Sequence, residues 1–183
     1  MSFSQREFRD ALGVFPTGVA VVTAATPAGL ELGITVNSFA SVSLDPPLVS
    51  FNVARTLKSF DEFIQCKAFA VNVLREEQSA LSHGFGRPSG EKWATVERRV
   101  GKTACPILEP HLAAFECESY ATFEAGDHVI IVGRVVHIEI NQTGSALIFY
   151  RGAYHRVGET LSGKQSSDMP SAQPAEERHR RVS

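Results

Sequence analysis

Residues 33–51, GITVNSFASVSLDPPLVSF, decide how this sequence is interpreted. Hydroxyl and amide side chains lie between apolar ones, ahead of Asp45-Pro46-Pro47 and a run typical of a buried strand, residues 48–53. Buried hydroxyl and amide groups cost free energy unless they are hydrogen-bonded. A bound ligand with phosphate oxygens and a polar ring edge would satisfy them. We therefore interpret the segment as a candidate cofactor-binding segment rather than ordinary core.

The overall composition is ordinary for a globular domain. The chain has 183 residues, enough for one domain with a proper core. Hydrophobic residues make up 43% and charged residues 21% of the chain, as in typical domains of this kind. The net charge of −2 gives no electrostatic basis for a nucleic-acid partner.

The cysteines and the hydropathy favour a cytoplasmic protein. Cys66, Cys105 and Cys117 show no CxxC spacing, and an odd count without a pairing pattern fits a reducing compartment. No apolar run approaches the roughly 20 residues of a membrane span. The N-terminal residues are charged and lack the apolar core of a signal peptide. We expect neither a membrane nor a nucleic acid as partner.

The hydrophobic pattern predicts many strands and few helices. Strands are expected at 19–26, 30–36, 48–53, 69–74, 112–123, 128–140, 147–150 and 154–157. Ser4 and Glu7 have the spacing of a capping box for a first helix that ends near Gly13. A short helix should carry Phe60, Phe63 and Ile64, another should span 76–85, and an irregular excursion should span 87–110.

The order of these elements predicts the fold class. Sequential strands joined by short turns, with few helices, favour a mainly β protein: an antiparallel barrel with peripheral helices. Residues 1–158 should form this single domain. From Glu159 onward the chain is rich in Ser, Gly, Gln, Pro and charged residues. Such a segment buries too little apolar surface to offset its ordering entropy, so we expect 159–183 to be a disordered tail.

Several common catalytic motifs are absent from the sequence. No GxGxxG follows a strand, and neither GxxxxGK[ST] nor GxSxG occurs. The six histidines form no HxH or HExxH pair, so we expect no metal site. These absences disfavour hydrolases and metalloenzymes. Redox chemistry by an organic cofactor stays open because it needs few catalytic groups from the protein.

An ordered set of motifs resembles the short-chain flavin reductase family. The motifs are FPTGV at 15–19, GITVNSF at 33–39, SVSLDPPL at 41–48, FAVNVL at 69–74, GDH at 126–128 and GRV at 133–135. The resemblance implies an FMN-binding split β-barrel and usually a homodimer. It also implies reduction of FMN or FAD by NADH or NADPH. The reduced flavin would pass to a partner flavin-dependent monooxygenase.

The family's motif implies that Thr35, Val36, Asn37 and Ser38 contact the flavin. Hydroxyl and amide groups, with adjacent backbone N–H groups, can bond phosphate oxygens and the polar edge of the ring. The alternative is that these residues only form a turn after the strand, since Asn and Ser favour turns.

Ser41 and Ser43 are candidates for the wall beside the flavin ring. Pro46 and Pro47 favour an extended backbone without N–H donors, which would suit a rigid wall next to a flat ring. The alternating serines fit a solvated strand face equally well.

Further candidates follow the later strands. The resemblance implies that Asn52, Val53, Ala54 and Arg55 help to hold the cofactor, with Arg55 as a cation for a phosphate. A solvated loop charge is the alternative for Arg55. Tyr154 is a candidate for dinucleotide contact, with a core position as its alternative.

His128 is the candidate catalytic residue. It follows a turn and opens a long strand, near the rim of the expected barrel. The family places its matching histidine near the flavin and the nicotinamide, where it can position the dinucleotide or assist proton movement. A turn-flanking histidine without a ligand is the alternative.

Three function hypotheses follow. The first is an NAD(P)H:flavin oxidoreductase in which hydride passes from nicotinamide C4 to flavin N5. The second is a flavin-binding sensor or electron-transfer protein without turnover. The third is a reductase of another acceptor, such as a corrinoid or an oxidised pyridoxine-type substrate, on the same barrel.

Overall fold

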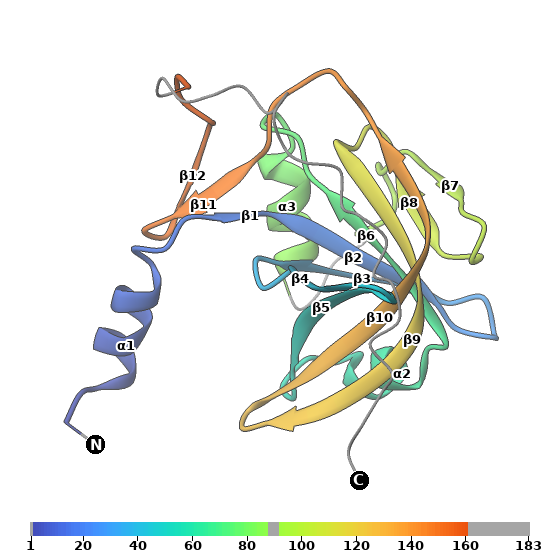
Figure 1. Ribbon diagram of the computed structural model, residues 1–183, viewed down its shortest axis with the longest axis horizontal. Coiled ribbons are helices and arrows are strands. Elements are labelled where there is room, and N and C mark those ends of the chain that lie inside the picture. Colours follow the sequence, from blue (N-terminus) through green and yellow to red (C-terminus); the bar gives the residue numbers. More distant parts are fainter. Residues whose placement is uncertain (1, 88–91, 161–183) are drawn as a thin grey trace, which may run out of the picture.

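The structure is a computed structural model that describes residues 2–87 and 92–160. Its centre is a seven-stranded antiparallel sheet with the order β3-β2-β6-β9-β10-β5-β4 (Figure 1). These strands are β2 (Ala20–Ala25), β3 (Glu31–Val36), β4 (Ala40–Leu44), β5 (Pro47–Ala54), β6 (Ala68–Val73), β9 (Ala113–Ala125) and β10 (His128–Ile140). The predicted mainly β, antiparallel fold class is confirmed.

The remaining elements surround this sheet. Three helices are α1 (Gln5–Leu12), α2 (Phe60–Gln65) and α3 (Ser79–Gly86). Strands β1 (Thr17–Gly18), β11 (Ile148–Tyr150) and β12 (Ala153–His155) form a small second sheet, and β7 (Arg98–Val100) pairs with β8 (Pro106–Leu108).

The opening of the barrel lies between β3 and β4. These two strands are the edges of the large sheet, yet they follow one another in the chain, joined by residues 37–39. The chain therefore crosses from one edge directly to the other. The stretch 33–51 supplies most of β3, all of β4 and more than half of β5, so it builds the opening of the split barrel.

The first helix has the predicted capping box. The Ser4 hydroxyl accepts from the Glu7 N–H, and the Glu7 carboxylate accepts from the Ser4 N–H at 2.7 Å. Reciprocal bonds of this kind satisfy donors that the first helical turn leaves free. Helix α1 projects from the body of the protein (Figure 1), and none of its residues is buried. Its apolar Phe8 and Leu12 are both more than half exposed.

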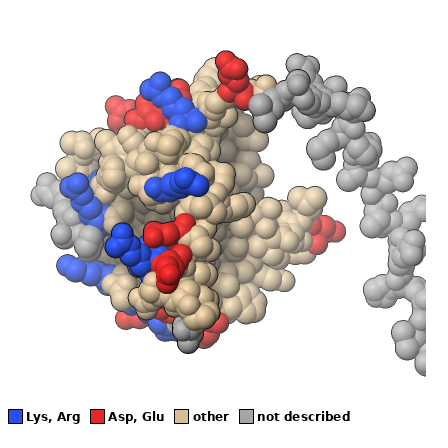
Figure 2. Space-filling view, turned by 90° about the vertical axis from the view of Figure 1, so that its left-hand side faces the viewer, with Lys and Arg blue, Asp and Glu red and all other residues tan. Residues whose placement is uncertain are grey.

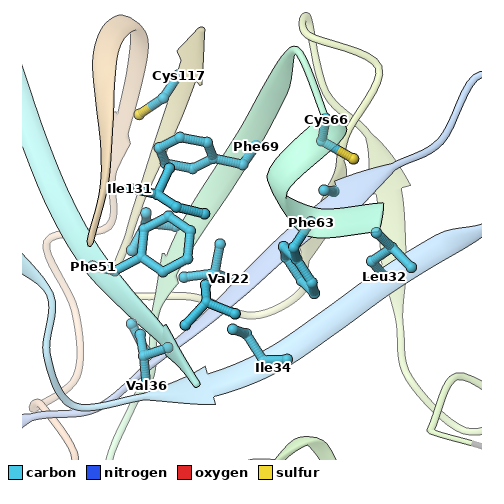
Figure 3. Packing of buried hydrophobic residues seen from close by; sticks show 14 of the residues in the cluster. Val22, Leu32, Ile34, Val36, Phe51, Phe63, Cys66, Phe69, Cys117 and Ile131 are labelled. Carbon is cyan, nitrogen blue, oxygen red and sulfur yellow. The ribbon is translucent and has the colours of Figure 1, made fainter. Parts of the chain in front are cut away.

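Large apolar side chains from both halves of the sheet fill the barrel. Phe51 and Phe69 meet edge to face with ring centroids 5.0 Å apart, and Ile131 packs in the same cluster (Figure 3). Gly133 of β10 allows this packing because a Cβ there would lie 2.2 Å from the Phe69 ring.

A buried polar network joins β8 to the large sheet. Asn72 donates to Val21 O and to Thr23 Oγ1, each at 3.1 Å, and accepts from Leu108 N at 2.9 Å. Thr23 donates to Pro106 O at 2.5 Å. Because each amide atom of Asn72 has a partner, its complete burial costs little.

Three local predictions differ from the structure. Helix α3 begins at Ser79 rather than Glu76, because Gln78 folds back to accept from Arg75 N at 2.8 Å. The interval 87–110 contains the β7–β8 hairpin, whose first strand is fully exposed and carries no hydrophobic alternation. Residues 45 and 46 form the turn between β4 and β5, so only the second proline, Pro47, lies in an extended strand.

The surface charges, the hydropathy of the helices and the chain ends do not change this description of the fold. Acidic and basic side chains lie interspersed on the face drawn in Figure 2, in keeping with the small net charge. No helix in residues 2–87 or 92–160 has the length and hydropathy needed to cross a membrane. Apart from Glu159 and Thr160, the predicted tail lies outside the described residues. The predicted domain boundary at 158 stays a prediction.

Candidate functional site

A cavity of about 610 Å³ lies at the opening of the barrel. Its wall is formed by the end of β3, the crossing segment (residues 37–39, which join β3 to β4), β5, the start of β10, and helices α1 and α3. The lining residues are Leu12, Ile34, Thr35, Val36, Asn37, Ser38, Asn52, Ala54, Thr56, Leu57, Phe85, Gly86, Arg87 and His128. The volume is in the range of small-molecule and cofactor sites.

The end of β3 delivers the predicted contact residues to this cavity. Thr35, Val36, Asn37 and Ser38 all line it, and Asn37 is exposed. The Thr35 hydroxyl donates to Ser82 O at 2.6 Å, so its proton is already used and its lone pairs stay available as acceptors. The hydroxyl-rich stretch is therefore not buried core. Its first part, residues 34–38, forms cavity wall, and the predicted role of this segment in cofactor binding stays a prediction.

Ser38 connects the crossing segment to β5. Its Oγ accepts from Asn52 N at 3.0 Å. Strand β4 pairs with β5 no further along β5 than Ser50, so the Asn52 N–H lies beyond the ladder and takes Ser38 as its partner. The hydroxyl proton of Ser38 remains available as a donor. Asn52 and Ala54 reach the cavity from the same strand.

His128 reaches the cavity from the first position of β10, opposite Ala54 of β5. Its Nδ1 lies 2.8 Å from Asp127 Oδ1. The hydrogen bond from His128, and then the charge of the imidazole, lower the pKa of Asp127. The carboxylate is thus ionised at neutral pH and can only accept, so Nδ1 carries the proton. In neutral His128 this leaves Nε2 as an acceptor.

Three other predicted residues do not line the cavity. Ser41 and Ser43 lie on β4, beyond the crossing segment. Val53 is 1% exposed because its side chain faces the barrel core, opposite in direction to Asn52 and Ala54.

Arg55 and Tyr154 are engaged elsewhere. Arg55 pairs with Glu124, donates to Gly126 O at 3.3 Å and lies over the Phe60 ring. It therefore braces the β9–β10 turn against the segment after β5. The Tyr154 hydroxyl lies 2.7 Å from Ser82 Oγ, which ties β12 to α3. Their predicted roles in cofactor binding stay predictions.

Half of the residues that line the cavity are not among those predicted from the sequence. The added residues are Leu12, Ile34, Thr56, Leu57, Phe85, Gly86 and Arg87. The apolar members carry no signal in sequence, because a side chain that lines a cavity looks like any core residue. Arg87 could have been proposed from the sequence, because it is a cation that directly follows the helix end carrying Phe85 and Gly86.

Close packing against β3 and Trp93 fixes the position of helix α3 beside the cavity. A Cβ on Gly33 would lie 2.4 Å from the Phe85 ring, so this glycine allows α3 to sit directly on β3. Trp93 packs edge to face on Phe85 with centroids 4.8 Å apart, and Lys92 Nζ donates to Phe85 O at 3.3 Å. Burial lowers the pKa of Lys92. The segment after residue 91 thus holds Phe85 in its place at the cavity.

Comparison with known proteins gives the family. Residues 12–158 match the model of the flavin reductase like domain. The chain belongs to the flavin reductase family. It is 44% identical to the FMN reductase (NADH) SmoA of Agrobacterium fabrum over 153 residues, which is 84% of this chain and 86% of that protein.

Solved structures agree with this assignment. The Streptomyces globisporus NADH:FAD oxidoreductase SgcE6, in complex with NAD and FAD fragments, superposes with a TM-score of 0.82 at 31% identity. The match covers 87% of this chain and 96% of that one. The flavin reductase PheA2 gives a TM-score of 0.79 at 34% identity, over 86% of this chain and all of its own.

Some relatives are much longer than this chain. The probable flavin reductase of Rhizobium meliloti is 45% identical over 165 residues, which is 90% of this chain and 52% of that protein. The chain therefore spans about half the length of this flavin reductase family member.

The cavity fits a flavin. Ile34, Val36, Leu57 and Phe85 provide apolar surface suited to a flat ring system, whereas Arg87 provides a cation suited to a phosphate. Ser38, Asn52, Thr56 and His128 add hydrogen-bonding groups suited to a polar ring edge and a ribityl chain.

Proposed function

We propose that the protein is an NAD(P)H:flavin oxidoreductase that reduces FMN or FAD and supplies the reduced flavin to a partner monooxygenase. The observation that carries this proposal is the cavity at the barrel opening. It combines apolar walls with a polar rim in a chain of the flavin reductase family. The relatives include the reductase component of the trigonelline monooxygenase of Acinetobacter baylyi.

The residues that line this cavity have different roles in flavin binding and proton transfer. A flavin held in this cavity would supply the redox chemistry. Thr35, Ser38 and Asn52 present hydrogen-bonding groups on a backbone that sheet pairing and the Ser38–Asn52 bond keep fixed. Arg87 offers charge to a phosphate. His128, oriented by Asp127, presents Nε2 as an acceptor that can hold or receive a proton.

Steady-state oxidation of NADH or NADPH with added FMN or FAD tests this activity. We expect a flavin-dependent rate with at least one pair, and a lower rate in His128→Ala. His155→Ala serves as control, because His155 contacts Tyr150 in the second sheet and does not line the cavity. Flavin binding without turnover would replace the proposal with an electron-transfer or sensor role. Turnover with another acceptor alone would make the protein a different reductase.

We also propose that the protein is a cytoplasmic homodimer. Apolar side chains on α1, on the segment that follows it and on β4 support an interface: Phe8, Leu12, Phe15, Val42 and Leu44 are each more than half exposed. The three cysteines are free and buried, as expected of a reducing compartment. Light scattering tests the dimer, and Leu44→Lys should shift it toward monomer. A monodisperse monomer at micromolar concentration would contradict it.

A further inference from the structure

Three metal-ligating side chains meet outside the flavin cavity. Glu116 of β9 lies opposite His137 of β10, and Glu139 follows two residues along the same strand. One ligand atom from each of the three lies within 4.8 Å of the others. None of them lines the cavity at the barrel opening. The absence of an HxH or HExxH motif gave no hint of this group, because strand pairing brings its members together.

Glu116 provides the observation that points to a ligand. The residue is 1% exposed. Its Oε2 accepts from Thr103 N at 2.7 Å and from Thr103 Oγ1 at 2.8 Å. Its Oε1 is buried and has no hydrogen-bond partner among the described residues. A buried carboxylate oxygen without a hydrogen-bond partner is costly.

The other two donors have a spacing that suits a metal ion. His137 Nε2 lies 3.4 Å from Glu139 Oε1. That separation is longer than the roughly 2.7–3.2 Å of an ordinary N–H···O hydrogen bond. It is close to the roughly 3.3 Å between two ligands that each lie about 2.0–2.1 Å from a tetrahedral zinc ion. The remaining Glu139 oxygen is held by Arg99, which fixes the carboxylate.

We propose that Glu116, His137 and Glu139 bind one divalent transition-metal cation of the zinc class. One imidazole and two carboxylates form a donor set that zinc accepts, with water as the fourth ligand. The metal would supply the partner that Glu116 Oε1 lacks. Through Thr103 it would also fasten the turn between β7 and β8 to the β9–β10 pair.

Lys102 competes with the metal ion for His137. Its Nζ lies 3.2 Å from His137 Nδ1, which then acts as acceptor and leaves the proton on Nε2. Metal binding at Nε2 requires the opposite tautomer, so Lys102 has to leave Nδ1. Lys102 is exposed, so water can take the place of His137 as its partner. The lysine and the cation therefore compete for His137, and removal of the lysine should strengthen metal binding.

Titration of the chelator-treated, flavin-free full chain with Zn²⁺ tests the site. We expect one zinc per chain by calorimetry, and visible absorption bands of tetrahedral Co²⁺ when cobalt replaces zinc. Glu116→Gln should weaken binding roughly 10- to 100-fold. Lys102→Met should strengthen it about three- to tenfold, the effect of removing one nearby like charge. Glu118→Gln is the control, because Glu118 lies on the same strand and pairs with Arg134 outside the group.

Two outcomes would overturn the proposal. One is the absence of zinc binding by the wild-type chain, which would make the group a plain hydrogen-bonded network. The other is zinc binding that Glu116→Gln and His137→Gln both leave unchanged, which would place the metal elsewhere. Circular dichroism of each variant without metal checks its fold. If Glu116→Gln does not fold, Glu139→Gln takes its place with the same expected weakening.

Discussion

Arg87 is the residue whose charge should decide how tightly the cavity holds a phosphate. It follows α3 directly and lines the cavity. Arg87→Ala should weaken FMN binding about tenfold, and Arg87→Lys should recover part of the loss, because lysine keeps the charge without the planar fork. Quenching of flavin fluorescence measures the affinity. Arg6→Ala is the control, since Arg6 lies on α1 near Asp10. Equal affinity of Arg87→Ala and wild type would remove Arg87 from the site.

Asp127 acts through His128. The hydrogen bond from His128 lowers the pKa of Asp127 in the folded protein. The hydrogen bond is therefore fully formed above the unfolded-state pKa of Asp127, and it is lost as the pH falls through the lower folded-state pKa. Asp127→Asn should reduce turnover about 3- to 10-fold, less than His128→Ala, because the amide orients His128 less firmly than the carboxylate does. Asp61→Asn, on α2, should retain the wild-type rate. Equal turnover of Asp127→Asn and wild type would show that Asp127 does not act through His128.

At the scale of elements, β3 and α3 approach one another only because residue 33 is glycine. Gly33→Ala should cost about 1–3 kcal/mol of unfolding free energy, because the new Cβ displaces the Phe85 ring. Flavin affinity should fall with it, since Phe85 lines the cavity. Gly84→Ala is the matched control: nothing lies within 4 Å of that Cβ, and alanine should stabilise α3 by roughly 0.5–1 kcal/mol. Urea unfolding measures both. Equal stability of the two variants would contradict this account.

The elements themselves were largely predictable from sequence. The capping box at Ser4, the alternation in 69–74 and the long runs on either side of residues 124–127 are local signals, and the structure contains each element. The β7–β8 hairpin was missed because β7 is exposed on both faces and β8 is buried on both. Neither strand shows the period of two that identifies a strand in sequence.

The sequence predicted only the part of the site that one continuous segment forms. Residues 35–38 are consecutive and carry a family motif, so they could be found. Leu12 and Phe85 reach the same cavity from separate helices, and in sequence each looks like any other apolar residue of its helix. Arg55 was predicted as the cation for a phosphate because its pairing with Glu124 depends on strand register, which the sequence does not display.

For the whole molecule, the buried thiols set the limit of stability at high pH. Burial raises the pKa of Cys117 to about 12. A raised folded-state pKa gives stability that is complete below the unfolded-state pKa, near 9, and is lost as the pH rises toward 12. The unfolding free energy should fall there by up to about 1.4 kcal/mol per pH unit.

Cys117→Ala tests this dependence through urea unfolding at several alkaline pH values. The variant should lose part of the slope, while Cys66 and Cys105, whose pKa values burial also raises, should keep the rest. An unchanged slope in Cys117→Ala would show that other groups control the alkaline loss.

The contacts of Lys92 and Trp93 have a consequence for solubility. Strand β3 is an edge of the large sheet, and an unpaired edge is a template on which another chain can add a strand. Trp93 Nε1 donates to Glu31 O at 3.2 Å and Lys92 Nζ to Gly33 O at 3.5 Å, so side chains occupy two alternate carbonyls along this edge. Trp93→Phe keeps an aromatic ring beside Phe85 but lacks the N–H, so it should aggregate on warming, seen as turbidity, before the wild type does. Equal turbidity of Trp93→Phe and wild type would show that the indole N–H does not protect the edge.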